Sequence, residues 1–331
     1  MRWSILIIEL FVLILGSVSA ATAETPSTGT LTLMYENDIF TGRDGHYTNG
    51  GGIVWVPDRG TPNPEWAERL AASVPWLPSE GELRHGYAFG QNMYTPADIE
   101  QSNPPTTDRP YAGWLYANFG VARETDRQLD LIVATLGIVG PGSGAARSQK
   151  AAHRFTGSQP PQGWSTQLHN EPGFGLTYER MWRGEAHESP ISGHVFDLQP
   201  YLGGVIGNVF TYANTGVMLR YGDRLPSDFG VPRIQPALLG SGDFTPSKDF
   251  NWYLFGGIEG RYVARNIFLD GNTFRDSRSV DKENWVGDMQ FGLVLDWQTF
   301  RVCYTHVLRT REFQTQGTKD SFGALTFSTK L

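Results

Sequence analysis

The chain has 331 residues, a formal net charge of −7 and only 18% charged residues, with 39 Gly and 13% aromatic residues. The negative balance argues against nucleic acid as a partner, because proteins that bind it carry a basic surface. A single cysteine, Cys303, excludes an intramolecular disulfide. Abundant glycine and aromatic residues with few charges are typical of a transmembrane β-barrel.

Residues 1–23 predict a secretory signal peptide. Arg2 precedes an apolar run from Ile5 to Leu15, and small residues follow that allow cleavage after Ala20 or Ala23. An uncleaved anchor is the alternative, although the run is shorter than the ~20 residues that a spanning helix needs. We expect the remaining chain, 24–331, to form one domain outside the cytoplasm.

Apolar and polar residues alternate in twelve later segments. In one of them Trp285, Met289 and Phe291 share a face, while Asp288 and Gln290 share the other. A period of two indicates strands, not helices. The segments are 29–40, 47–57, 83–93, 111–123, 127–139, 171–184, 191–206, 210–222, 249–265, 284–297, 299–310 and 319–331. The connection 58–82 predicts a short helix.

The predicted fold is all-β, a transmembrane antiparallel β-barrel of about twelve strands, with short helical segments in its loops. Single-chain barrels of the bacterial outer membrane have an even number of strands. A soluble β-sandwich is the alternative, although its strands are usually shorter. If both chain ends lie on the periplasmic side, then 41–46, 94–110, 140–170 and 266–283 lie on the outer side.

Polar side chains gather where this topology places the outer rim. Asn37 and Asp38 end the first strand, and Thr48 begins the second. Arg109 and Tyr111 lie around the start of the fourth strand. Oxygen ligands such as those of Asn37 and Asp38 suit a hard cation, calcium, better than a soft one. Turn chemistry alone is the other interpretation of these residues.

The segment AARSQKAAHRFTG in the 140–170 loop predicts a helical turn. Gln149 and His153 lie four residues apart in it and therefore share one face. An imidazole titrates near neutral pH and can take a proton from water as a general base. A surface histidine in a solvated loop is the alternative. The sequence has no Gly-x-Ser-x-Gly motif for a serine nucleophile and no HExxH motif for zinc.

Four motifs resemble the outer-membrane lipid A 3'-O-deacylase family, in order and along nearly the whole mature chain. They are ENDIF at 36–40, YTNG at 47–50, DRPYAGWLY at 108–116 and QKAAHR at 149–154. The resemblance implies a twelve-stranded barrel that hydrolyses the ester holding the 3'-acyloxyacyl chain of lipid A, with calcium required. It implies site residues at Asn37, Asp38, Thr48, Gln149 and His153.

In the mechanism that the resemblance implies, the histidine acts as base on a water molecule and calcium polarises the ester carbonyl. We expect Asp38 and Asn37 to hold the metal, and we predict that Arg109 and Tyr111 contact the substrate. The expected partner is lipid A or lipopolysaccharide in the outer leaflet of the bacterial outer membrane, reached from a site at the extracellular rim.

Two positions depart from the family pattern. No lysine lies between Met93 and Pro110, where Arg109 is the only cation, and Gln159 stands where the family has a glutamate. Two other functions stay open. One is an outer-membrane phospholipase with the same catalytic groups, and the other is a structural or pore-forming barrel without enzymatic activity.

Overall fold

The computed structural model describes residues 27–38, 46–230 and 249–331. The predicted signal peptide, 1–23, and most of the first hairpin tip lie outside the described residues. No helix among the described residues is long and apolar enough to cross a membrane.

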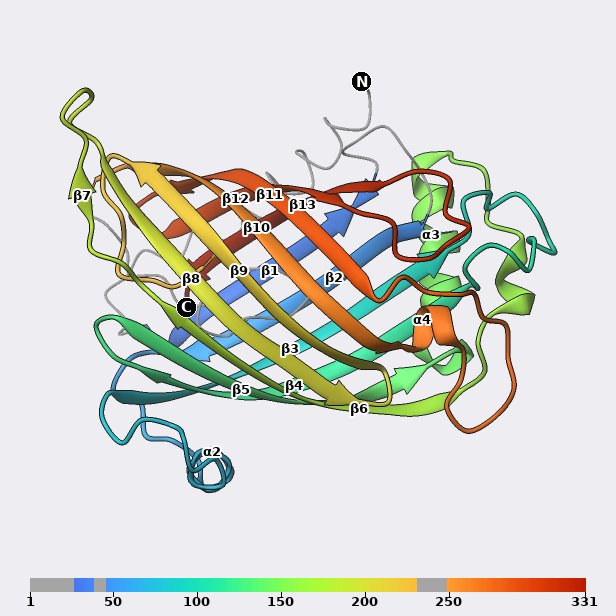
Figure 1. The fold of residues 1–331 in the computed structure, drawn as a ribbon, viewed down its shortest axis with the longest axis horizontal. Coiled ribbons are helices and arrows are strands. Elements are labelled where there is room, and N and C mark those ends of the chain that lie inside the picture. The colour runs from blue at the N-terminus through green and yellow to red at the C-terminus, as the bar shows by residue number, and fades with distance from the viewer. Residues whose placement is uncertain (1–26, 39–45, 231–248) are drawn as a thin grey trace.

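Twelve long antiparallel strands form a closed barrel, as the sequence predicts (Figure 1). They are β1 (Gly29–Asn37), β2 (His46–Pro57), β3 (Glu82–Thr95), β4 (Ala112–Glu124), β5 (Gln128–Val139), β6 (Glu171–Trp182), β8 (Val195–Gly207), β9 (Phe210–Gly222), β10 (Asn251–Asn266), β11 (Trp285–Asp296), β12 (Phe300–Arg309) and β13 (Asp320–Lys330). Pairing of β1 with β13 and of β6 with β8 closes the ring. A two-residue strand, β7 (His187–Glu188), pairs with β8 and was not predicted.

Alternate residues of each strand face the lumen and the membrane. On β11, Trp285, Met289 and Phe291 are exposed, whereas Asp288 and Gln290 are buried inside the barrel. The apolar face therefore meets lipid and the polar face fills the lumen, as the period of two predicts.

The two ends of the barrel carry different structures (Figure 1). We call one the α3 end, because it holds η2 (Pro141–Ser143), α3 (Ala145–Thr156), η3 (Gly163–Thr166) and α4 (Ile267–Asp270). The opposite, α2 end holds α2 (Glu65–Ala72), which confirms the helix predicted within 58–82. Strand β1 begins and β13 finishes at the α2 end, where Gly29 and Lys330 lie close together.

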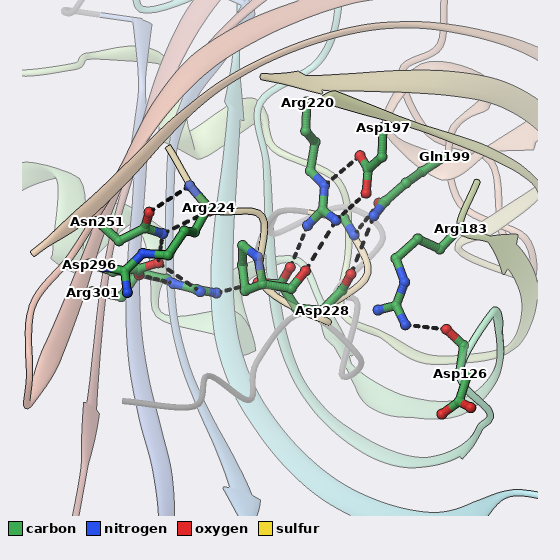
Figure 2. Close-up of polar contacts among 12 residues, drawn as sticks. Asp126, Arg183, Asp197, Gln199, Arg220, Arg224, Asp228, Asn251, Asp296 and Arg301 are labelled. Atoms are coloured by element: carbon green, nitrogen blue, oxygen red, sulfur yellow. Dashed lines mark hydrogen bonds and ion pairs between the residues drawn. The ribbon is translucent and has the colours of Figure 1, made fainter. Parts of the chain in front are cut away.

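A segment after β9 crosses the lumen at the α2 end (Figure 2). Asp228 in this segment forms ion pairs with Arg220 of β9, at 2.5 Å, and with Arg301 of β12, at 2.6 Å. Asp197 and Asp296 complete the pairing of these two arginines. Phe229 is buried beside the network, with the Arg183 guanidinium 4.8 Å from its ring centroid. Because Asp228 pairs with arginines of two strands, and Asp197 and Asp296 pair with the same arginines, the network fixes the segment across the opening.

The lumen is also filled at the α3 end. The apolar residues of α4, Ile267, Phe268 and Leu269, are fully buried. The ring of Phe268 stacks on Tyr94 of β3 with centroids 3.9 Å apart. Side chains therefore occupy the lumen near both of its ends.

Candidate functional site

One row of backbone positions links four strands at the α3 end. Asn37 of β1 pairs with Asn49 of β2, which pairs with Met93 of β3, which pairs with Gly113 of β4. Neighbouring strands lie ~4.8 Å apart, so the row spans about 14 Å. The predicted first, second and fourth strands therefore meet at neighbouring positions of the barrel wall. We call these four paired positions the Asn37 row.

A tyrosine joins the two asparagines of this row. The Tyr35 hydroxyl oxygen accepts a hydrogen bond from Asn37 Nδ2 at 3.1 Å and from Asn49 Nδ2 at 2.9 Å. Both amides are thereby oriented, with their nitrogens toward Tyr35 and their oxygens turned away from it, where they can accept hydrogen bonds or bind a cation. Sequence reasoning gave no role to Tyr35 or Asn49, although YTNG contains the second of them.

Asp38 and Thr48 flank the row. The Asp38 side chain is buried at the end of β1. Thr48 lies at a register shift of β2 between Tyr47 and Asn49, opposite β3. Such bulges re-aim side chains and are frequent beside active sites. The side chain of Thr48 lies outside the described part, so its predicted role stays a prediction.

Helix α3 rests on β4 because Gly113 has no side chain. A Cβ at that position would lie 2.4 Å from Ala145 Cβ and 2.1 Å from Ser143 Oγ. Gly144 and Gly157, with φ of 73° and 70°, bound the helix at its two ends. The left-handed backbone at both positions favours glycine. Thus the Asn37 row ends where α3 begins, and Figure 1 shows α3 at the end of the barrel where β2 starts.

A tryptophan fixes the side chain of Gln149 by a hydrogen bond. It is buried, and its Oε1 accepts a hydrogen bond from Trp164 Nε1 at 2.6 Å. Trp164 lies 5.0 Å from the ring of Tyr111, whose hydroxyl donates to the Ile99 carbonyl. The Gln149 Nε2 is buried and has no hydrogen-bond partner among the described residues. It can donate to an oxygen atom of a bound molecule.

His153 lies one turn further along the same helix and is half-buried, so the predicted i, i+4 pair is confirmed as helical. Its Nδ1 lies 2.5 Å from the backbone carbonyl oxygen of Gln159. A carbonyl can only accept, so Nδ1 carries the proton and Nε2 is the basic nitrogen of the neutral ring. Gln159, which stands where the family pattern has a glutamate, therefore contacts His153 through its main-chain carbonyl.

Arg109 and Tyr111, predicted to contact substrate, are both buried. The Arg109 guanidinium carbon lies 5.2 Å from the centroid of the Tyr94 ring, and Nη1 lies 3.4 Å from Glu312 Oε2. Its Nε and Nη2 have no hydrogen-bond partner within the described ranges. In this structure the two side chains support the loops of the α3 end, and their contact with substrate stays a prediction.

The oxygen atoms at the end of β1 are of the kind that binds a hard cation. Asn37 and Asp38 offer amide and carboxylate oxygens on adjacent residues, and the Tyr35 contact turns the Asn37 nitrogen away. Among the described residues, no group of three or more His, Cys, Asp or Glu side chains could hold a metal by itself. Calcium at this position would therefore take further oxygen ligands from water, main chain or substrate.

The closed barrel of twelve long strands with a lipid-facing apolar belt defines an outer-membrane β-barrel protein with a polar site at one rim. The family model described as "Outer membrane protein LpxR" matches residues 6–331. The chain therefore belongs to the LpxR family of outer membrane proteins.

Comparison with solved structures supports the fold. LpxR from Salmonella typhimurium superposes with a TM-score of 0.74 at 19% identity, covering 91% of this chain and 100% of that one. The β domain of the Bordetella autotransporter BrkA, at 10% identity, covers 92% and 100% with a TM-score of 0.43. A score that low carries no argument about the site. No curated protein matches the chain.

Proposed function

We propose that the protein is a calcium-dependent outer-membrane esterase that hydrolyses the 3'-acyloxyacyl ester of lipid A. The observation that carries the proposal is the anchoring of α3 beside the Asn37 row, through the contact of Gly113 with Ala145. The contact seats the start of the helix that carries Gln149 and His153 on the same row of strand ends as Asn37, which supports the assignment of these residues to one site. The family membership and the four motifs support the same activity.

His153 would act as the general base. With its proton on Nδ1 held by Gln159, Nε2 takes a proton from water as the water oxygen attacks the acyl carbonyl. The tetrahedral intermediate then breaks its bond to the sugar oxygen, and that oxygen recovers the proton from the imidazolium. The products are the free acyloxyacyl carboxylic acid and a lipid A with one hydroxyl in place of the ester.

The neighbouring side chains would orient the reacting groups. Gln149 Nε2 has donor hydrogens to offer to the water or to the carbonyl oxygen, and Trp164 fixes the amide in place. Calcium, when bound near Asn37 and Asp38, would supply positive charge for the oxygen on which negative charge develops. Tyr35 keeps the Asn37 amide in the orientation that this role requires.

The α3 end would face outward from the cell. The first strand begins and the last strand finishes at the α2 end, which suits the periplasmic side of a bacterial barrel. The 140–170 connection at the α3 end carries a twelve-residue helix, and long extracellular loops are usual in these barrels. A lipid in the outer leaflet would then reach the wall beside β1 without leaving the membrane.

The side chains near both ends of the lumen favour an enzyme over a pore. The Asp228 ion pairs cross one end and Phe268 packs against Tyr94 at the other. A passive channel needs a continuous aqueous path, and these contacts place side chains in the lumen near both of its ends. A phospholipase is the alternative that the site itself supports, because the same groups would attack a glycerophospholipid ester.

Mass spectrometry of the products separates the two esterase functions. Purified protein in detergent with calcium is incubated with hexa-acylated lipid A or, in parallel, with phosphatidylethanolamine. We expect loss of one acyloxyacyl group from lipid A and an unchanged phospholipid. A lysophospholipid beside intact lipid A would replace the proposal by the phospholipase.

A further inference from the structure

Three polar side chains lie on the membrane-facing side of β12 and β13. Along β12, Arg301, Cys303, Thr305, Val307 and Arg309 are buried in the lumen, so Tyr304 and His306 belong to the opposite face. Ser321 on β13 shares this outward face, because its neighbours Asp320 and Phe322 are buried. Polar and ionisable groups on the lipid-facing wall are costly, and they commonly mark functional positions.

These side chains contact one another. His306 Nε2 lies 3.1 Å from Ser321 Oγ, and His306 Nδ1 lies 3.4 Å from the Tyr304 hydroxyl. The ring of Phe291 on β11 stacks on the imidazole with centroids 4.9 Å apart. The histidine is therefore held in one orientation on the outer wall, close to the α3 end of its strand.

The cluster is a neighbour of the candidate site. His306 pairs with Gly323 of β13, and Gly323 pairs with Asn37 of β1. His306 thus extends the Asn37 row by two strands, a separation of about 10 Å at the usual strand spacing. Gly323 has no side chain to stand between them. One molecule on the outer wall can therefore contact both positions.

A groove runs along the wall at this cluster. Its lining includes His306, Ser321, Lys319, Leu308 and Met289. Lys319 is exposed in the turn before β13, and Leu308 and Met289 are exposed on the apolar face. The groove therefore presents an ammonium, a hydroxyl and an imidazole at one side and hydrocarbon at the other.

Two acids, Asp288 and Asp320, also line the groove, and both are buried. Asp288 pairs with Arg261 at 2.6 Å and with Arg309 at 2.8 Å inside the lumen. On the outer side the groove is lined by the ammonium of Lys319, the hydroxyl of Ser321 and the imidazole of His306, groups that suit the oxygens of a phosphate.

We propose that this groove binds a phosphate group of the lipid substrate, with an acyl chain along Leu308 and Met289. The inference rests on the proposed function for the identity of the lipid. Binding there would hold the headgroup at His306, Ser321 and Lys319 while an ester of the same molecule lies at the Asn37 row. The groove would thereby favour phosphorylated lipids over phosphate-free ones.

The test measures binding without turnover. In a His153→Ala background, native mass spectrometry in detergent follows binding of bis-phosphorylated lipid A and of chemically dephosphorylated lipid A. Lys319→Met and Ser321→Ala remove one donor each, and neither changes the barrel core. Arg311→Met removes another exposed cation of the same loop and serves as the matched control.

We expect Lys319→Met and Ser321→Ala each to weaken binding of the phosphorylated lipid about tenfold, the effect of one charge-assisted hydrogen bond. Binding of the dephosphorylated lipid should not change, and Arg311→Met should resemble the parent. Equal binding of phosphorylated lipid by parent and both variants would overturn the inference. An equal loss for both lipids would overturn it as well.

The wild-type protein tests the proposed function separately. If the Lys319→Met and Ser321→Ala variants lose binding of the phosphorylated lipid alone, but the wild type does not deacylate lipid A, the phosphate groove is supported and the esterase function is refuted. Deacylation together with unchanged binding in the variants would refute the groove alone.

Discussion

Replacing Gly113 by alanine tests whether the seating of α3 on the barrel wall controls activity. The new Cβ would lie 2.4 Å from Ala145 Cβ, and the helix must move by about 1 Å to restore van der Waals contact. The Ser143 hydroxyl, at 2.1 Å, can rotate away, but Ala145 Cβ is fixed to the helix backbone. The helix carries Gln149 and His153, so this movement displaces both from the Asn37 row.

A displacement of about 1 Å at a catalytic group costs about 100-fold in rate. The overpacking itself should cost about 1–3 kcal/mol of stability, which leaves a closed barrel of this size folded. The assay is the initial rate of acyl release from lipid A by mass spectrometry, with heat-dependent gel mobility as the measure of folding.

Gly51→Ala and Gly260→Ala are matched controls for this experiment. Both positions lie in strands, and an added Cβ meets nothing within 4 Å. Each should retain the wild-type rate. If Gly113→Ala also kept the full rate, while folded, α3 would not position the reacting groups and the reasoning would fail.

Three further predictions follow from the same contacts. Trp164→Phe removes the donor to Gln149 Oε1 and should lower kcat about tenfold, as expected for a lost buried hydrogen bond. The control Trp76→Phe, at an exposed position of the α2 end, should leave kcat unchanged. Equal rates for the two variants would contradict this prediction. Wild-type protein should give no steady conductance in planar bilayers. Asp228→Ala should give opening events that Asp223→Ala does not, because Asp228 pairs with Arg220 and Arg301 of two strands whereas Asp223 pairs with its neighbour Arg224. An open wild-type channel would refute the prediction. Chelation with EGTA should abolish deacylation and added calcium should restore it, while undiminished activity in the chelator would exclude the metal.

The barrel could be predicted from the sequence because its signal is local. Strand faces alternate with a period of two, so Trp285 and Met289 point to lipid and Asp288 to the lumen without knowledge of any partner strand. Counting the alternating segments then gave twelve strands. Strand β7 was missed, because two residues are too few to show a period.

The candidate site was predictable only in part. Gln149 and His153 are four residues apart, and helical geometry alone places them on one face. The contact of Gly113 with Ala145, and that of Tyr35 with Asn49, depend on strand register and loop path, which no local pattern encodes. Likewise, the i, i+2 pattern of Tyr304 and His306 became informative only when Gly323 was found between His306 and Asn37.

The most direct test of the account is the effect of His153→Ala on purified protein acting on lipid A in the presence of calcium. Arg154→Ala changes the next residue, an exposed base on the same helix, and is the matched control. The account predicts that His153→Ala releases acyl groups at least about 1,000 times more slowly than wild type, within the range that general-base catalysis contributes, and that Arg154→Ala stays within a few-fold. Wild-type rates in the folded His153→Ala protein would contradict the proposed mechanism.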